Sequence, residues 1–160
     1  MGQNPASDSH KPGKLFDGDT ATFYHGKWNS RNPGVKVYFG YEVEVSKVKI
    51  INRLDLQSYY KHLENTVVSV MLKDTGGDVD CGTLTNVNVV SGEVADQTYI
   101  VPCGNKRGIG VSLQKQSGAQ AWCISELEIV YIFTGMKLNC KSCTGHPRYY
   151  CNNSMIYKTD

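Results

Sequence analysis

The stretch "YEVEVSKVKII", residues 41–51, is the segment from which the fold can best be predicted. Apolar side chains alternate with polar ones along it, which is typical of a β-strand that buries one face. The apolar residues expected on the buried face are Val43, Val45, Val48 and Ile50. Their phase changes halfway along, so we predict a β-bulge near Ser46.

Further short runs rich in Val, Ile and Tyr follow the same rule. They cover residues 35–39, 66–73, 86–90, 98–101, 108–113 and 126–132. Turn-forming clusters separate them, including "DTGGDVD" at 74–80 and "CGNKRG" at 103–108. No stretch keeps a helical period for three turns. The pattern therefore predicts an all-β protein, an antiparallel β-sandwich of about eight strands.

Size and charge exclude several classes of function. The 160 residues suit one main domain, and 17 basic against 15 acidic residues leave a net charge of +2. This charge is too small for nucleic acid or an anionic membrane to be the main partner, and no apolar run is long enough for membrane insertion. The sequence contains no nucleophile elbow, P-loop or HExxH motif, so we expect no enzyme activity.

Six cysteines are unevenly placed: Cys81, Cys103, Cys123, Cys140, Cys143 and Cys151. An even count indicates disulfides and an oxidising compartment, so we expect a secreted, extracellular protein whose signal peptide has been removed. The spacing of Cys140, Cys143, His146 and Cys151 leaves zinc as the alternative. We divide the chain into a β-sandwich, 1–134, and a Cys-rich C-terminal tail, 135–160. We expect disulfides to cross-link the tail, either internally or to the sandwich. Asn152 begins a glycosylation sequon.

"LFDGDTATFYHGKW", residues 15–28, contains the first candidate site. Asp17-Gly18-Asp19 places two carboxylates around a glycine turn, which suits a hard cation that binds oxygen ligands. A third acid, Glu126, begins the last predicted strand. The alternative interpretation of Asp17-Gly18-Asp19 is an Asx turn.

Four blocks in this order, "LFDGDTATFYHG", "PGVKVYF", "VKIINRLD" and "ISELEIVYI", resemble the F-type lectin (fucolectin) family, within the discoidin-like (coagulation factor C-type) superfamily. The resemblance covers residues 6–132. It implies a jelly-roll-like discoidin sandwich and a secreted lectin that binds fucose or related glycans on glycoproteins. It also implies a structural calcium ion (Ca2+).

The resemblance assigns the calcium ligands and one disulfide. The ligands would be the side chains of Asp17 and Glu126 with the carbonyls of Lys14, Asp19, Lys27 and Ser125. Lys27 stands where the family usually has a serine, so one hydroxyl ligand is lost. Cys81 and Cys103 match a family disulfide. The other four cysteines allow three connectivities, and we expect one bridge to join the tail to the sandwich through Cys123.

The sugar-binding motif of the family matches Arg53-Leu54-Asp55, followed by Lys61 one residue late. Arginine and lysine would donate to sugar oxygens while Asp55 orients Arg53. His25 is the expected histidine, although block alignment puts Ser30 at that contact and leaves His62 as a replacement donor.

Several alternatives remain at this stage. An Arg53–Asp55 pair could merely hold the loop, in an adhesion module that binds a protein partner and has lost the sugar site. A module for lipid headgroups would use exposed apolar loop residues: Trp28, Leu54, Leu56, Tyr59 and Tyr60. The sequence is also compatible with a homo-oligomer.

Overall fold

The computed structural model describes residues 10–26, 33–53, 62–73, 76–85, 87, 98–116 and 122–133, and the backbone of 149–152 and 155–158. The fold is a β-sandwich, as predicted, and a short 3-10 helix precedes the first described strand. The elements are η2 (Pro12–Phe16), β1 (Tyr24–His25), β2 (Gly34–Ile51), β3 (Thr66–Met71), β4 (Asp78–Leu84), β5 (Thr98–Lys115), β6 (Cys123–Ile124), β7 (Glu126–Phe133), β8 (Tyr149–Asn152) and β9 (Met155–Lys158).

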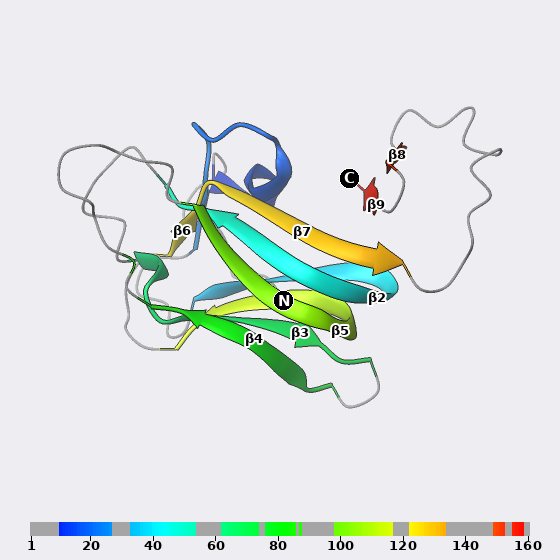
Figure 1. Ribbon diagram of the computed structural model, residues 1–160. Helices are drawn as coiled ribbons and strands as arrows, with labels where there is room; N and C mark the ends of the chain where they lie inside the picture. Colours follow the sequence, from blue (N-terminus) through cyan, green and yellow to red (C-terminus); the bar gives the residue numbers. More distant parts are fainter. Residues whose placement is uncertain are drawn as a thin grey trace.

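Two long strands, β2 and β5, run through both layers of the sandwich (Figure 1). The hydrogen-bonded order is β4-β3-β5-β2-β7, and every pairing is antiparallel. The start of β2 pairs with the end of β5, which pairs with β3. The second part of β2 pairs with the start of β5 and with β7. Each predicted pair of shorter strands at 35–51 and at 98–113 is therefore one bent strand.

The predicted bulge near Ser46 is confirmed, because the register of β2 shifts between Val45 and Lys47 against both neighbours. The residues of β5 that lie opposite this bulge are those of "CGNKRG". They belong to the strand, so the turn predicted there is wrong. Gly104 (φ 61°) and Asn105 (φ 57°) adopt the left-handed conformation. Glycine and asparagine accept that conformation most readily, so residues typical of turns form a bulge here instead.

The turn predicted at 74–80 is also partly wrong, because β4 begins at Asp78. The first residues of β4 fall in the predicted turn because of the glycines and aspartates there, although Val79 alternates with Asp78 and Asp80. The strand pairs with β3 at the edge of the sheet, where acidic side chains remain in solvent. The strand predicted at 86–90 falls mostly outside the described residues.

The core confirms the face predicted from the opening stretch. Val43, Val45, Val48 and Ile50 are all fully buried. Trp122 is fully buried too, and its indole nitrogen donates to Thr66 Oγ1 at 3.0 Å. A buried indole N–H needs such a partner, so this bond joins the segment before β6 to β3.

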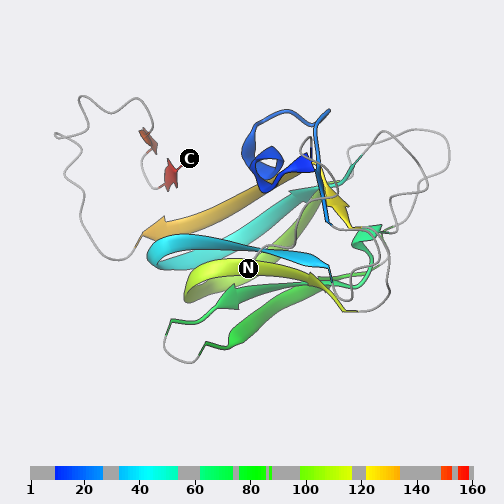
Figure 2. The ribbon, with the colours of Figure 1, turned by 180° about the vertical axis from the view of Figure 1, so that it is seen from behind.

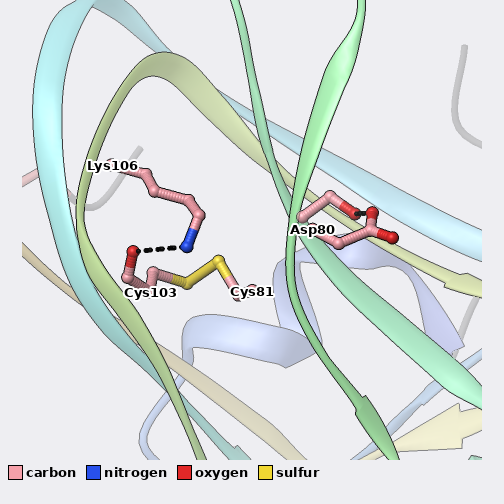
Figure 3. Close-up of a disulfide and its surroundings, with 5 residues drawn as sticks. Asp80, Cys81, Cys103 and Lys106 are labelled. Atoms are coloured by element: carbon pink, nitrogen blue, oxygen red, sulfur yellow. Dashed lines mark hydrogen bonds between the residues drawn. A yellow bond between two sulfur atoms is a disulfide. The ribbon is translucent and has the colours of Figure 1, made fainter.

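The disulfide between Cys81 and Cys103 is confirmed (Figure 3). It links β4 to β5, and Lys106 Nζ donates to the Cys103 carbonyl at 3.2 Å beside it. Cys123 lies fully buried in β6. The side chains of the three tail cysteines and His146 are outside the described part, so the remaining bridges, the zinc alternative and the domain division stay predictions. Within the described residues, no helix is long and apolar enough to cross a membrane.

Candidate functional site

The two short strands β1 and β6 pair at one end of the sandwich, beside η2 (Figure 2). His25 pairs with Cys123 in this small sheet. The Ser125 amide donates to the Ile51 carbonyl at 3.0 Å, which holds the end of β2 against the same segment. Arg53 follows Ile51 by two residues, so it emerges on the same end of the molecule as His25.

An aromatic ring supports the Arg53 guanidinium. Arg53 Cζ lies 3.7 Å from the centre of the Phe23 ring, which is a cation–π contact. His10 stacks on Phe23 at 4.5 Å between ring centroids, and the His10 and His25 rings are 6.0 Å apart. We call His10, Phe23, His25, Arg53 and His62 the Arg53 cluster. Phe23 and His10 were not predicted as site residues, although Phe23 lies two residues before His25.

His25 and His62 are buried beside this guanidinium, with 8% and 9% of their surface exposed. Burial lowers the pKa of His25, and the nearby His10 and Arg53 lower it further against an opposing backbone contact at Gly26. Burial also lowers the pKa of His62 to about 4, and positive charge from Lys115, His25 and Arg53 acts in the same direction. Both imidazoles are therefore neutral at pH 7, when each ring offers one N–H donor and one acceptor nitrogen.

A buried lysine fixes the backbone of this histidine. Lys115 is only 4% exposed, and its ammonium donates to the His62 carbonyl at 2.9 Å. Burial lowers the pKa of Lys115, while the Glu64 carboxylate opposes that effect. The structure thus brings the replacement donor, His62, into the cluster together with His25 and Arg53. Asp55, Lys61 and Ser30 lie outside the described residues, so their roles remain predictions.

The second predicted site begins in the turn after η2. Asp17 accepts hydrogen bonds from Lys14 Nζ (2.9 Å), from Thr22 Oγ1 (2.8 Å) and from the Asp19 amide (3.2 Å). Although burial opposes its charge, these donors hold the pKa of Asp17 well below its usual range. The Asp19 carboxylate accepts from the Ala21 amide at 2.9 Å. The Asx-turn interpretation is therefore confirmed for these residues.

Glu126, at the start of β7, faces Asp17 and completes a carboxylate pair. Burial raises the pKa of Glu126 to about 7, with a further contribution from the Asp17 carboxylate, while the Gly18 and Asp19 amides oppose the shift. Within the described residues, two buried atoms here, Glu126 Oε1 and Ser125 Oγ, have no hydrogen-bond partner. Buried oxygens without donors fit a bound cation.

The acidic group contains two facing carboxylates rather than three. In the part of the chain that the structure describes, no group of three or more His, Cys, Asp or Glu side chains is arranged to hold a metal ion. A cation here would need backbone carbonyls as well, which is the ligand set that the resemblance implies. Lys27 lies outside the described residues. The Lys14 ammonium already lies on Asp17, so a metal ion would have to compete with it.

Comparison with solved structures identifies the type of fold. No family model and no curated protein sequence matches the chain. Among solved structures, a fucose-binding module from Streptococcus pneumoniae superimposes with a TM-score of 0.61 at 18% identity, covering 77% of this chain and 84% of that one. The lectin domain of lectinolysin, solved with Lewis b antigen, gives 0.59 at 20% identity, with 81% and 93% covered.

A fucolectin from striped bass (Morone saxatilis) serum gives a TM-score of 0.65 at 19% identity. The match covers 81% of this chain but only 43% of the fucolectin, so the chain spans less than half of that protein. These likenesses show that the fold is discoidin-like, as the sequence resemblance implied.

Proposed function

We propose that this chain is a carbohydrate-binding lectin that recognises fucose or a related glycan through the Arg53 cluster. The observation that carries the proposal is the meeting of Arg53 with two buried, neutral histidines at the loop end of a discoidin-like sandwich. The fold likeness to fucose-binding modules and a fucolectin supports the same conclusion.

The chemistry of the cluster suits a sugar ring. A guanidinium donates two parallel N–H bonds, which match two neighbouring oxygens of a pyranose. The neutral imidazole of His25 or His62 adds one donor or acceptor. Phe23 holds the Arg53 plane in place, which lowers the entropy lost when the ligand binds. Asp55 and Lys61 would complete the site from the following loop.

Binding can be tested with a glycan array followed by calorimetry on Arg53→Ala. Loss of a charged hydrogen-bond donor should weaken fucoside binding by at least about tenfold. Arg53→Lys should retain part of the affinity because it keeps the charge but not the fork of donors. Arg107→Ala is the matched control, since Arg107 is an exposed arginine of β5 paired with Glu42. No array signal with or without calcium would contradict the proposal.

We also propose that a structural calcium ion joins the η2 turn to β7. The side chains of Asp17 and Glu126 and the carbonyls of Lys14, Asp19, Lys27 and Ser125 would hold it. Glu126 Oε1, which is buried without a hydrogen-bond partner among the described residues, supports this assignment. When bound, the ion would neutralise the facing carboxylates and stiffen the turn that leads to Phe23 and β1. We further propose that the protein acts outside the cell as a binding protein, without catalysis.

A second candidate function is an adhesion module that binds a protein partner. The stacking of Arg53 on Phe23 favours it, because the same contact would serve a guanidinium that only braces its own loop. Cell adhesion that persists in excess free fucose, together with a negative glycan array, would support this alternative over the lectin.

A further inference from the structure

A polar hollow lies on the outer face of β3, β4 and β5, which is the face of the sheet that points away from the core. Its cavity volume is about 260 Å³, slightly below that of pockets for drug-sized ligands, so its size suits one sugar ring. It shares no residue with the Arg53 cluster. It is lined by Val67, Ser69, Asp78, Asp80, Ser112, Gln114, Lys115 and Gln116.

The strand register explains why polar groups gather here. Asp80 of β4 lies opposite Ser69 of β3, which lies opposite Ser112 of β5. Directly opposed residues of neighbouring strands point to the same face of a sheet, so these three form one row. Figure 3 shows that Asp80 projects away from the disulfide at Cys81, that is, away from the core. Lys36 of β2 lies opposite Ser112 and extends the row.

Hydrogen bonds within the hollow fix its acceptors in place. Ser69 Oγ donates to Asp80 Oδ1 at 2.7 Å, and Ser112 Oγ donates to Asp78 Oδ2 at 3.0 Å. Both serines are only 3% exposed, so the two hydroxyls are buried and hold the carboxylates in position. Each bond uses one oxygen of its carboxylate. The other oxygen, Oδ2 of Asp80 and Oδ1 of Asp78, can accept from a ligand.

An apolar floor and a polar rim add further ligand-binding groups to the hollow. Val67 lies opposite Gln114, is 7% exposed, and gives the floor an apolar patch. The Gln114 amide at the rim offers both a donor and an acceptor. A sugar ring presents the matching surface, with hydroxyl groups around an apolar C–H face.

Charge argues against a bare cation as the ligand. Lys36 Nζ lies 3.9 Å from Asp78 Oδ2 and partly neutralises it. Asp78 and Asp80 are two residues apart on one strand, which separates their Cα atoms by about 7 Å. Across the described residues, no acidic group of three or more side chains is arranged to hold a metal ion.

We propose that this hollow is a second ligand site, which binds one neutral sugar ring through the carboxylates of Asp78 and Asp80. Vicinal hydroxyls would donate to the two unused carboxylate oxygens while the C–H face lies on Val67. The site is separate from the proposed lectin site at Arg53, and it does not depend on fucose recognition there. Lys115 follows Gln114 along β5, and its own side chain lies on the opposite face, where it donates to the His62 carbonyl.

Two-dimensional ¹H–¹⁵N NMR titrations with D-galactose and with L-fucose, each to high millimolar concentration, test the proposal. Binding in the hollow should shift the amide signals of Ser69, Ser112 and Gln114. Asp80→Asn keeps the shape of the side chain and the acceptor for Ser69 but removes the charge. The dissociation constant obtained from these shifts should therefore rise about tenfold. Glu128→Gln is the matched control, because Glu128 is an exposed carboxylate of β7 paired with Lys49.

The outcome separates the two sites. Arg53→Ala should leave the shifts at the hollow intact, and Asp80→Asn should leave those at Gly26 and Arg53 intact. If neither sugar shifts the three hollow amides in the wild-type protein, the second site is overturned, whatever happens at Arg53. The second site would also be overturned if calcium chloride or spermine, but neither sugar, shifted these amide signals. The carboxylates would then bind cations.

Discussion

Arg53 and Phe23 form the contact on which the orientation of the candidate sugar-binding site depends, with 3.7 Å between the guanidinium carbon and the ring centre. Phe23 belongs to the segment before β1, whereas Arg53 follows the end of β2. The two residues meet because β6 lies between β1 and the end of β2. The aromatic ring therefore packs against the guanidinium and supports it.

Phe23→Leu should weaken fucoside binding by about three- to tenfold, because an apolar side chain of smaller size removes the cation–π contact but not the guanidinium. Calorimetry against a fucosylated glycan measures the change. Phe16→Leu is the control, since Phe16 is 40% exposed in η2. Unchanged affinity in Phe23→Leu would show that Arg53 needs no aromatic support.

Stability should fall as the pH drops from 6.5 towards 4, because His62 remains neutral in the folded protein. Burial lowers its folded pKa to about 4, so the unfolded chain binds the additional proton in this range. The contribution of His62 is complete above pH 6.5 and is lost by pH 4. It amounts to at most about 3 kcal/mol.

Urea unfolding of wild type and His62→Gln, followed in EDTA at several pH values, isolates this effect. Glu126 has the opposite sign, because its raised pKa destabilises the folded protein as the pH increases towards 7. The difference between the two proteins removes that common contribution. A difference that does not change with pH between 6.5 and 4 would rule out a neutral, buried His62.

Calcium should raise the melting temperature of the wild type and EDTA should lower it, while Glu126→Gln should show neither change. In EDTA at pH 8 the variant should be at least as stable as the wild type. The reason is that a neutral amide avoids the repulsion between the Glu126 and Asp17 carboxylates. Glu128→Gln, on the exposed face of the same strand, should behave as wild type.

Lys14→Gln should tighten calcium binding several-fold, since the Lys14 ammonium lies 2.9 Å from Asp17 Oδ2 and competes with the ion for that carboxylate. The calcium dependence of the melting temperature measures the affinity. Weaker binding in Lys14→Gln would show that the lysine side chain supports the turn rather than competing with the ion.

Gly108→Ala should lower the free energy of unfolding by about 1–3 kcal/mol, because an added methyl group overpacks the contact between β5 and β3. A Cβ at this position would meet the Met71 carbonyl and Val70 Cγ1. Gly13→Ala is the control, as a Cβ there has nothing within 4 Å. Equal urea midpoints for the two variants would contradict the close approach.

The local pattern of the sequence predicted the buried face of β2, the bulge near Ser46 and the all-β class. Alternation along one strand is a property of neighbouring residues, so it can be recognised without knowing the partner strand. The same reasoning failed at "CGNKRG" and at β4. Glycine and asparagine favour left-handed backbone in a bulge as much as in a turn, and the glycines and aspartates that indicate a turn at 74–80 continue into the edge strand.

The candidate sites depended on more than the local sequence. The resemblance to F-type lectins named Asp17, Glu126, His25 and Arg53, but nothing in the sequence indicated that Phe23 would support the guanidinium. Nor did it indicate that the outer row of Asp80, Ser69 and Ser112 would form a hollow. Such contacts join strands that are distant in the chain, and they require the register of several strands at once.

The sequence by itself determined that this chain folds as a β-sandwich, because the period of its apolar side chains matches the pleat of a strand. The tertiary structure decided which polar side chains meet. Bent strands β2 and β5, the short β1–β6 pair and the antiparallel register bring His25, His62 and Arg53 together at one end. Side-chain chemistry is local, but the distance between two side chains is fixed only when the whole core has packed.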